Sequence, residues 1–171
     1  MKIHKLFAAI VLSLCLWGTI ASPAIGGTIA VKQDFTGDYT KIQDAIDSAA
    51  AGDEVVVYQG IYTGTKNIDL DFKGKAITVR SSDPNDPVVV ASTIIDCLGS
   101  QATPHRGFSF HSGEGSQSVL KGLTITHGYY LQGGGILVDS ASSPTIANCV
   151  ITGNSAVSLG GGILLSHHRW Q

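Results

Sequence analysis

The sequence predicts an all-β fold in which short strands wind into stacked coils, and two observations support that prediction. The first is a repeat: Gly133-Gly134-Gly135-Ile136 returns as Gly160-Gly161-Gly162-Ile163, 27 residues later. The second is an alternation of apolar residues in steps of two after residue 53. Self-similarity at a period of about 20 to 50 residues is the signature of repeat architectures. We therefore expect each repeat to form one coil of a solenoid.

The first 24 residues have the layout of a secretory signal peptide. Lys2 and Lys5 precede an almost wholly apolar stretch over residues 6–20, and small residues follow, so cleavage is expected after Ala21 or Ala24. The alternative is an uncleaved membrane anchor, but a membrane span needs about 20 apolar residues. We expect an exported, secreted or cell-surface chain whose mature part, residues 25–171, forms one domain without a membrane span.

Composition limits the classes of partner. The formal net charge is −2, and only 14% of the residues are charged, so the chain lacks the basic footprint that nucleic-acid binding requires. Average globular proteins contain roughly 25% charged residues, so uncharged polar residues must cover much of this surface.

A single amphipathic helix is predicted over residues 40–50. Thr40 and Gln43 have the spacing of a capping box, and Gly52 stands where a left-handed C-terminal cap is expected. The helix precedes the first regular strand, where an N-terminal cap of the stack belongs, because an uncovered end would expose unpaired strand edges.

Strands follow without further helices. Each is marked by a pair of apolar residues two positions apart, and Gly/Pro/Asn/Asp clusters separate them. The pairs are Val55 and Val57, Ile68 and Leu70, Ile77 and Val79, Val88 and Val90, Phe108 and Phe110, and Leu123 and Ile125.

The repeat predicts which side chains stack. Residues 122–128 align with residues 148–154 at an offset of 26, so equivalent side chains should form columns through the coils. Ile136 should stack on Ile163 and Val138 on Leu165, with the glycine triplets at the corners before these strands. The expected inward residues are Leu123, Ile125, Cys149 and Ile151, and the expected outward ones are Thr124, Thr126, Val150 and Thr152.

Two cysteines remain after the predicted leader, Cys97 and Cys149, 52 residues apart. If both occupy one column, two coils separate them by about 10 Å, whereas a disulfide needs Cα atoms within about 7 Å. Separate buried thiols are favoured, and a disulfide stays possible in an exported chain.

Several segments carry motifs of one known architecture. Residues 38–46 read Asp-Tyr-Thr-Lys-Ile-Gln-Asp-Ala-Ile, and residues 51–57 and 60–62 follow them. Together with residues 75–81 and 93–96, they resemble the entry and early coils of right-handed parallel β-helix proteins of the pectin-lyase-like superfamily. The Gly-Gly-Gly-Ile coils resemble repeats of exported bacterial surface proteins of the polymorphic outer-membrane type. The resemblance spans residues 28–165 and implies a right-handed parallel β-helix, whereas function depends on a site.

Enzymes of that superfamily cleave acidic polysaccharides, and the resemblance implies what such an enzyme needs. Its lyases use calcium-binding carboxylates and a basic residue, and its hydrolases use clustered aspartates, because one carboxyl group protonates the leaving oxygen while another activates water. No two aspartates are adjacent in this sequence, and His127-Gly128 matches only the His-Gly element of polygalacturonases. We expect His127 to be a polar turn residue and the chain to lack catalytic residues.

Four aspartates are candidate calcium ligands: Asp69, Asp71, Asp83 and Asp86. Asp69 and Asp71 are two apart on a predicted strand and would share a face, and calcium favours several oxygen ligands. The alternative is that these aspartates lie on a solvated face and in a turn, where aspartate caps its own backbone. No cofactor is expected unless these aspartates bind calcium.

Other polar and aromatic residues fall near predicted corners. Tyr129 and Tyr130 precede a glycine triplet and either offer a flat surface to a sugar ring or pack within a loop. Asp96 and Glu114 are expected to be turn residues, and Asn148 and Asn154 structural turn asparagines.

These observations favour an exported β-helix module with a structural or carbohydrate-binding role, whose partner is a polysaccharide or cell-surface component. The alternative is a polysaccharide lyase or glycoside hydrolase whose catalytic coils are missing. The last coil begins at Gly160 and the sequence ends at Gln171 without a predicted cap. We therefore expect a fragment of a longer surface or secreted protein.

Overall fold

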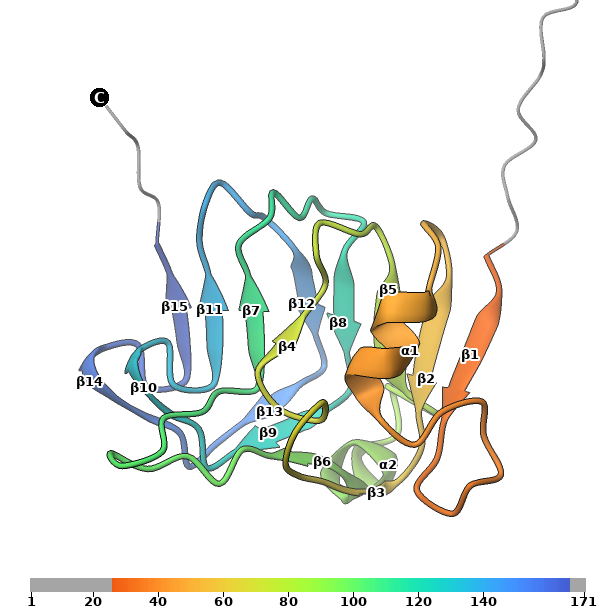
Figure 1. The fold of residues 1–171 in the computed structure, drawn as a ribbon, viewed down its shortest axis with the longest axis horizontal. Coiled ribbons are helices and arrows are strands. Elements are labelled where there is room, and N and C mark those ends of the chain that lie inside the picture. The colour runs from red at the N-terminus through yellow and green to blue at the C-terminus, as the bar shows by residue number, and fades with distance from the viewer. Residues whose placement is uncertain (1–25, 167–171) are drawn as a thin grey trace, which may run out of the picture.

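The computed structural model describes residues 26–166 as a right-handed parallel β-helix (Figure 1). Three parallel sheets form its walls, and a two-stranded sheet pairs β10 (Tyr129–Gln132) with β14 (Ser155–Leu159). Sheet A contains β1 (Thr28–Val31), β2 (Glu54–Val57), β5 (Thr78–Ser81), β8 (Val119–Lys121) and β12 (Thr145–Ala147). Sheet B contains β3 (Gly60–Tyr62), β6 (Thr93–Asp96), β9 (Thr124–Thr126) and β13 (Val150–Ile151). Sheet C contains β4 (Leu70–Asp71), β7 (Phe108–Phe110), β11 (Ile136–Val138) and β15 (Ile163–Leu165).

The predicted columns are confirmed by the strand register. Ile136 pairs with Ile163 and Val138 with Leu165, and on sheet B Ile125 pairs with Ile151 at the predicted offset of 26. In sheet C the column continues from Ile136 to Phe108, which is fully buried. Stacking therefore turns a sequence repeat into continuous apolar ladders.

The glycine triplets form corners, as predicted. Gly133 and Gly160 have φ angles of 62° and 66°, a left-handed conformation that favours glycine. The next coil approaches so closely that a Cβ atom on Gly134 would lie 2.0 Å from the Ser155 carbonyl oxygen. The triplet therefore meets both a conformational and a steric requirement.

The interior contains the predicted inward residues. Leu123 and Ile125 are fully buried, and Cys149 and Ile151 are partly buried against the core. Three phenylalanines form an aromatic cluster at sheet C, where the ring centroids of Phe72 and Phe110 lie 4.8 Å apart. Burial of each such side chain stabilises the fold by roughly 1.5–3 kcal/mol.

Helix α1 (Ile42–Ser48) is shorter than the predicted helix over residues 40–50, and the capping box does not form. The N-cap residue makes no side-chain cap; instead the Ile42 amide donates to Asn67 Oδ1 at 3.1 Å and the Gln43 amide donates to the Lys66 carbonyl at 2.8 Å. Gly52 has a φ of 92° but lies beyond the helix, which ends with an extended C-cap at Ala49. Partners from the following coil therefore replace the local caps.

The prediction that this helix covers the first coil is confirmed, but the helix does not precede the first strand, because β1 comes before it in the chain. Its buried residues include Ala45 and Ile46, which belong to the hydrophobic core. In Figure 1, α1 lies at the β1 end of the stack, and its closest strands are β1, β2 and β4.

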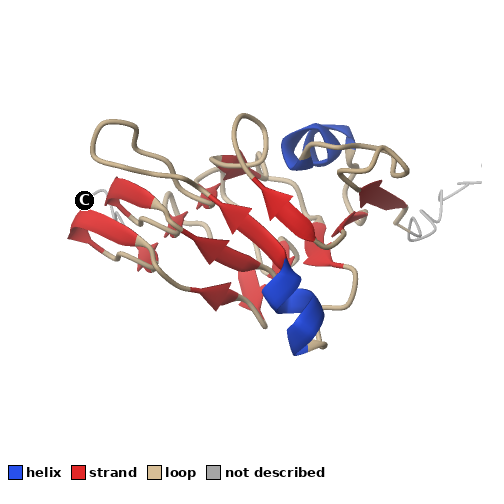
Figure 2. Cartoon of the chain, turned by 90° about the horizontal axis from the view of Figure 1, so that it is seen from below, coloured by secondary structure: helices blue, strands red, loops and turns tan. Residues whose placement is uncertain are grey.

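The strand predicted at Val88 and Val90 is wrong, because residues Pro87–Ser92 form helix α2. Asp86 caps it by accepting a hydrogen bond from the Val88 amide at 2.8 Å, and proline at the first helical position is pre-set for a helix. Figure 2 shows the strands in stacked rows with both helices at the margins.

Helix α2 also changes the exposure of the outward face of sheet B. Val150 and Thr152 are exposed there as predicted, but Thr124 is only 8% exposed. Its hydroxyl donates to the Val90 carbonyl at 2.8 Å. Thr124 therefore points outward and is covered by α2.

Cys97 and Cys149 are separate free thiols, but they do not share a column. Cys97 follows β6 and Cys149 precedes β13, so they lie at opposite ends of the strands of sheet B. Burial raises the pKa of Cys97 to about 12. Each thiol is therefore part of the packed interior rather than half of a disulfide.

The predicted signal peptide, residues 1–24, lies outside the described residues. Between residues 26 and 166, neither helix has the length and apolar character to cross a membrane.

Candidate functional site

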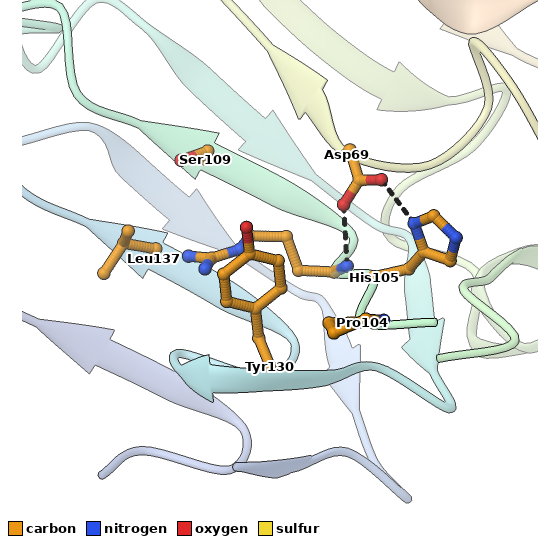
Figure 3. Close-up of a pocket in the computed structure, with 7 residues that line it drawn as sticks. Asp69, Pro104, His105, Ser109, Tyr130 and Leu137 are labelled. Atoms are coloured by element: carbon orange, nitrogen blue, oxygen red, sulfur yellow. Dashed lines mark hydrogen bonds and ion pairs between the residues drawn. The ribbon is translucent and has the colours of Figure 1, made fainter. Parts of the chain in front are cut away.

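A pocket of about 380 Å³ lies beside sheet C (Figure 3). Its floor includes Ser109 of β7 and Leu137 of β11, which are register neighbours and alternate with buried residues on either side. They therefore project from the outer face of the sheet. The lining residues are Asp69, Pro104, His105, Arg106, Ser109, Tyr130 and Leu137.

Asp69 lies on one side of the pocket and contacts two neighbouring residues. Its φ of 52° departs from strand geometry just before β4, and its carboxylate reaches the segment before β7. Oδ2 lies 2.7 Å from His105 Nδ1, and Oδ1 accepts a hydrogen bond from the Arg106 amide at 2.9 Å. The two dashed lines in Figure 3 mark these interactions. The carboxylate thus orients an imidazole and fixes the backbone of Arg106.

Arg106 and Tyr130 form a cation–π pair within the lining. The guanidinium carbon lies 3.7 Å from the centroid of the Tyr130 ring, well inside the roughly 6 Å range of this interaction. Arg106 is only 6% exposed, and its Nη1 atom is buried without a hydrogen-bond partner. Desolvation lowers the pKa of the guanidinium, although arginine stays protonated at physiological pH.

Backbone hydrogen bonds bring Arg106 and Tyr130 together. The His105 amide donates to the Tyr129 carbonyl at 2.9 Å, and the Tyr129 amide donates to the His105 carbonyl at 2.8 Å, in an antiparallel bridge. Gly107 follows, where a Cβ atom would lie 2.6 Å from Ile125 Cγ2. The close packing at Gly107 and the bridge together bring Arg106 over the next coil.

The structure separates the two predicted substrate-binding tyrosines. Tyr130 lines the pocket, whereas Tyr129 is not among the lining residues and contributes its backbone to the bridge. Both tyrosines are partly buried in β10. Tyr129 therefore has the packing role, and Tyr130 both packs against its neighbours and lines the pocket.

The four candidate calcium ligands occupy two different corners of the coil. Asp69 and Asp71 flank Leu70 in the corner that enters sheet C, and Asp71 Oδ1 accepts from the Lys73 amide at 2.7 Å. Asp71 Oδ2 also lies 3.6 Å from His111 Nε2.

The other two aspartates lie between β5 and β6. Asp83 Oδ1 accepts from the Asn85 amide at 3.0 Å, and Asp86 caps α2. Over residues 26–166, no three Asp, Glu, His or Cys side chains gather as a metal site. Calcium binding by these aspartates stays a prediction.

The predicted turn residues make specific contacts between coils. His127 has a φ of 52° and its Nδ1 lies 2.9 Å from Asp96 Oδ1. Asp96 is the last residue of β6 and not a turn residue, because it pairs with Thr126 of β9. Asn154 accepts from the Gly128 amide at 2.7 Å, and Asn148 donates to the Pro84 carbonyl at 3.1 Å. Asn148 and Asn154 therefore have the structural role expected of them.

Glu114 is more than a turn residue, because it is only 1% exposed. Its carboxylate accepts from the amides of Gly74 and Ser112 and from the Ser142 hydroxyl, at 2.8 to 2.9 Å. These donors come from three successive coils, so Glu114 links them.

Sequence reasoning missed most of the pocket: Pro104, His105, Arg106, Ser109 and Leu137. The strand register of the structure, rather than the sequence, reveals one distinguishing feature of Arg106. By the pairing of Phe108 with Ile136, Arg106 stands at the position that Gly134 occupies in the next coil. A long cation in place of a corner glycine is an unusual substitution in a repeat and marks a position with its own role.

Comparison of the chain with protein-family models, with curated proteins and with solved structures found no match. The superfamily resemblance therefore supports only the parallel β-helix that the structure shows. Function must be argued from the pocket, which combines an aromatic ring, a buried cation, a carboxylate–imidazole pair and a serine hydroxyl.

Proposed function

We propose that this chain is an exported β-helix module that binds a saccharide of a polysaccharide or cell surface in the pocket beside sheet C. The observation that carries the proposal is the Tyr130 ring, held by Arg106 in the wall of the pocket. An aromatic face can pack on the C–H groups of a sugar ring, and nearby polar groups can bind its hydroxyls. The volume of about 380 Å³ falls in the range of about 300–1,000 Å³ usual for ligand pockets.

Two further features support this proposal. The signal peptide predicted for residues 1–24 favours export, which would bring the pocket into contact with extracellular saccharides. The parallel coils also give the pocket a rigid frame, because its floor residues Ser109 and Leu137 lie on adjacent paired strands. Rigid placement lowers the entropic cost of binding.

The test is titration calorimetry of the purified protein against neutral and acidic oligosaccharides, with Tyr130→Ala and Tyr58→Ala compared. Tyr58 is a matched control because its ring contacts Lys32 and lines a different pocket. We expect Tyr130→Ala to weaken binding by about two- to twelvefold, since aromatic contacts contribute about 0.5–1.5 kcal/mol. Equal affinity of Tyr130→Ala and wild type would place the binding site elsewhere, and no binding to any saccharide would contradict the function.

The Asp69–His105 pair favours a second candidate, a polysaccharide lyase or glycoside hydrolase. A carboxylate 2.7 Å from an imidazole nitrogen is the arrangement by which a histidine is oriented for proton transfer. Incubation with pectate and calcium, followed by detection of unsaturated products, tests the lyase, and reducing-end release tests the hydrolase. Turnover that His105→Gln abolishes while binding persists would favour the enzyme over the binding module.

A further inference from the structure

The two ends of the β-helix differ in how their strand edges are covered. At the end where β1 lies, which we call the covered end, side chains of the same chain bind each edge. On β1, Asp38 Oδ2 accepts a hydrogen bond from the Ala30 amide at 2.8 Å. On β3, the Gln33 side chain donates to the Ile61 carbonyl at 2.7 Å. Gln43 of α1 binds the backbone of β4. These contacts block the addition of another strand at this end.

The strands of the last coil, residues 140–166, form the opposite end, which we call the open end. Within the described residues, β12, β13 and β15 each stand last in their sheets, and Figure 1 shows β15 at the other end of the stack from β1. The amides of Thr145, Val150 and Thr152 donate to the preceding coil. Because successive peptide groups of a strand point to opposite sides, those of Ile146 and Ile151 point away from the stack. The open end is therefore a template for strand pairing.

The side chains at the open end are apolar and surround a hollow. Ile163 and Leu165 continue the inward column of sheet C, yet they are 36% and 63% exposed. Together with Val138, Pro144 and Ile146, they line a hollow of about 290 Å³. Exposed apolar surface of this kind marks an interaction site, because its burial favours association.

The open end also lacks charge. Residues 140–166 contain no Asp, Glu, Lys, Arg or His, so residues 26–139 hold every charged side chain of the described part of the chain. Natural proteins often protect edge strands with charged side chains, and the centres of protein interfaces are depleted of charge. Two copies of this surface can therefore meet without repulsion between like charges.

We propose that the open end binds the open end of a second copy of this chain. The partner must offer uncharged, unpaired strand edges, which the open end of another copy has and its covered end lacks. A two-fold axis perpendicular to the stack sets the two open ends against each other, and their edge strands then pair antiparallel. The repeat of 27 residues supplies the roughly 20–30 residues per side of a standard interface. Because both open ends are covered, the assembly stops at two copies.

The first experiment measures the mass of the particle. Interfaces of this size have dissociation constants of about micromolar or tighter, so sedimentation of the purified protein at about 100 µM should give the mass of two copies. A monomer at this concentration would overturn the proposal. Larger polymers would also overturn it, because they require the covered end. A dimer that forms only after deletion of residues 167–171 would assign the open end to that segment instead.

Small-angle X-ray scattering tests the arrangement without any substitution. A β-helix extends in one direction, so two stacks joined at their ends form a particle about twice as long as one copy. Two stacks joined by their side walls keep the length of one copy. A dimer whose maximum dimension is that of a single stack would overturn the proposal.

Matched substitutions test the interface residues. Leu165→Asp places a carboxylate from each copy in the interface, so we expect the dissociation constant to rise at least about a hundredfold. Ile61→Asp is the control, because Ile61 is a strand residue at the covered end with a similar exposed fraction, 57%. It should leave the dimer intact.

Circular dichroism verifies that both variants keep their strands. An unchanged dissociation constant for Leu165→Asp, or an equal increase in both variants, would contradict binding through the open end. If Leu165→Asp does not fold, the mass and length of the wild-type particle decide the question.

Discussion

The side-chain amide of Gln43 pairs with both backbone polar groups of Asp71. Gln43 Oε1 accepts from the Asp71 amide at 3.0 Å, and Gln43 Nε2 donates to the Asp71 carbonyl at 3.0 Å. A parallel neighbouring strand would normally satisfy such groups at the edge of a sheet. A helix residue thus closes the edge of β4, which explains how α1 ends the stack.

Gln43→Glu should destabilise the protein by about 1–2 kcal/mol, because the carboxylate cannot donate to the Asp71 carbonyl and lies beside Asp47. Urea unfolding measures the change. Gln59→Glu is the control, since Gln59 is exposed in a turn between strands, and it should be nearly neutral. Equal effects of the two substitutions would show that the pairing with Asp71 contributes nothing.

Glu114 makes the free energy of unfolding depend on pH in the acidic range. Burial raises the pKa of its carboxyl group, but hydrogen bonds from Ser112, Gly74 and Ser142 outweigh this and leave the pKa below its usual value. A depressed folded-state pKa stabilises the protein above the unfolded-state pKa of about 4.3, and this contribution is lost as the pH falls through the folded-state value.

Glu114→Gln should therefore flatten the loss of stability below about pH 4.5, and Glu114→Ala should cost about 3 kcal/mol at pH 7, because three donors lose their acceptor. Glu54→Gln is the control, as its partly exposed pair with Arg80 should contribute about 0–1 kcal/mol. Denaturation curves between pH 3 and 7 that coincide for wild type and Glu114→Gln would refute this role.

The glycine corners give a matched pair of substitutions. A Cβ atom at Gly134 meets the Ser155 and Gly161 carbonyl oxygens at 2.0 and 2.6 Å, whereas a Cβ atom at Gly115 has no atom within 4 Å. Gly134→Ala should therefore cost more than about 2 kcal/mol, because the coils must move apart. Gly115→Ala should be neutral or stabilise by up to about 1 kcal/mol. Similar melting temperatures for the two variants would contradict the close stacking.

Calcium titration tests the four aspartates. Asp71, Asp83 and Asp86 already cap backbone amides, so we expect the melting temperature to be the same with calcium and with a chelator. Asp86→Ala should cost about 1 kcal/mol under both conditions, as for loss of an N-cap. A calcium-dependent rise that Asp71→Asn removes would instead support a metal site at the entry to sheet C.

The coil architecture was predictable from sequence where the chain repeats itself regularly. Thr124 pairs with Val150 and Ile136 with Ile163, which are the offsets of the repeat. The period fails in the preceding coil, where Thr78 pairs with Val119, 41 residues later. Helix α2 and the segment before β7 fill the added length, so the stacking partners there were not predictable.

That irregular coil supplies four of the residues that line the pocket: Pro104, His105, Arg106 and Ser109. Tyr130 was predicted as a binding residue because it precedes a regular glycine corner. His105 and Arg106 were not, because their position depends on an antiparallel bridge to Tyr129, which no local periodicity indicates. Local patterns predict the frame of this fold, and long-range backbone pairing places its site.

Within one copy of the chain, along the column from Phe108 through Ile136 to Ile163, the strands of sheet C should open to solvent more and more easily. The first two side chains are fully buried, but Ile163 is 36% exposed, and β15 pairs within the described residues only with β11. Amide protons of β15 should therefore exchange with solvent through local fraying, while those of β7 should exchange only when several coils open together. A pocket built on β7 and β11 would then be insulated from motions at the outer strand.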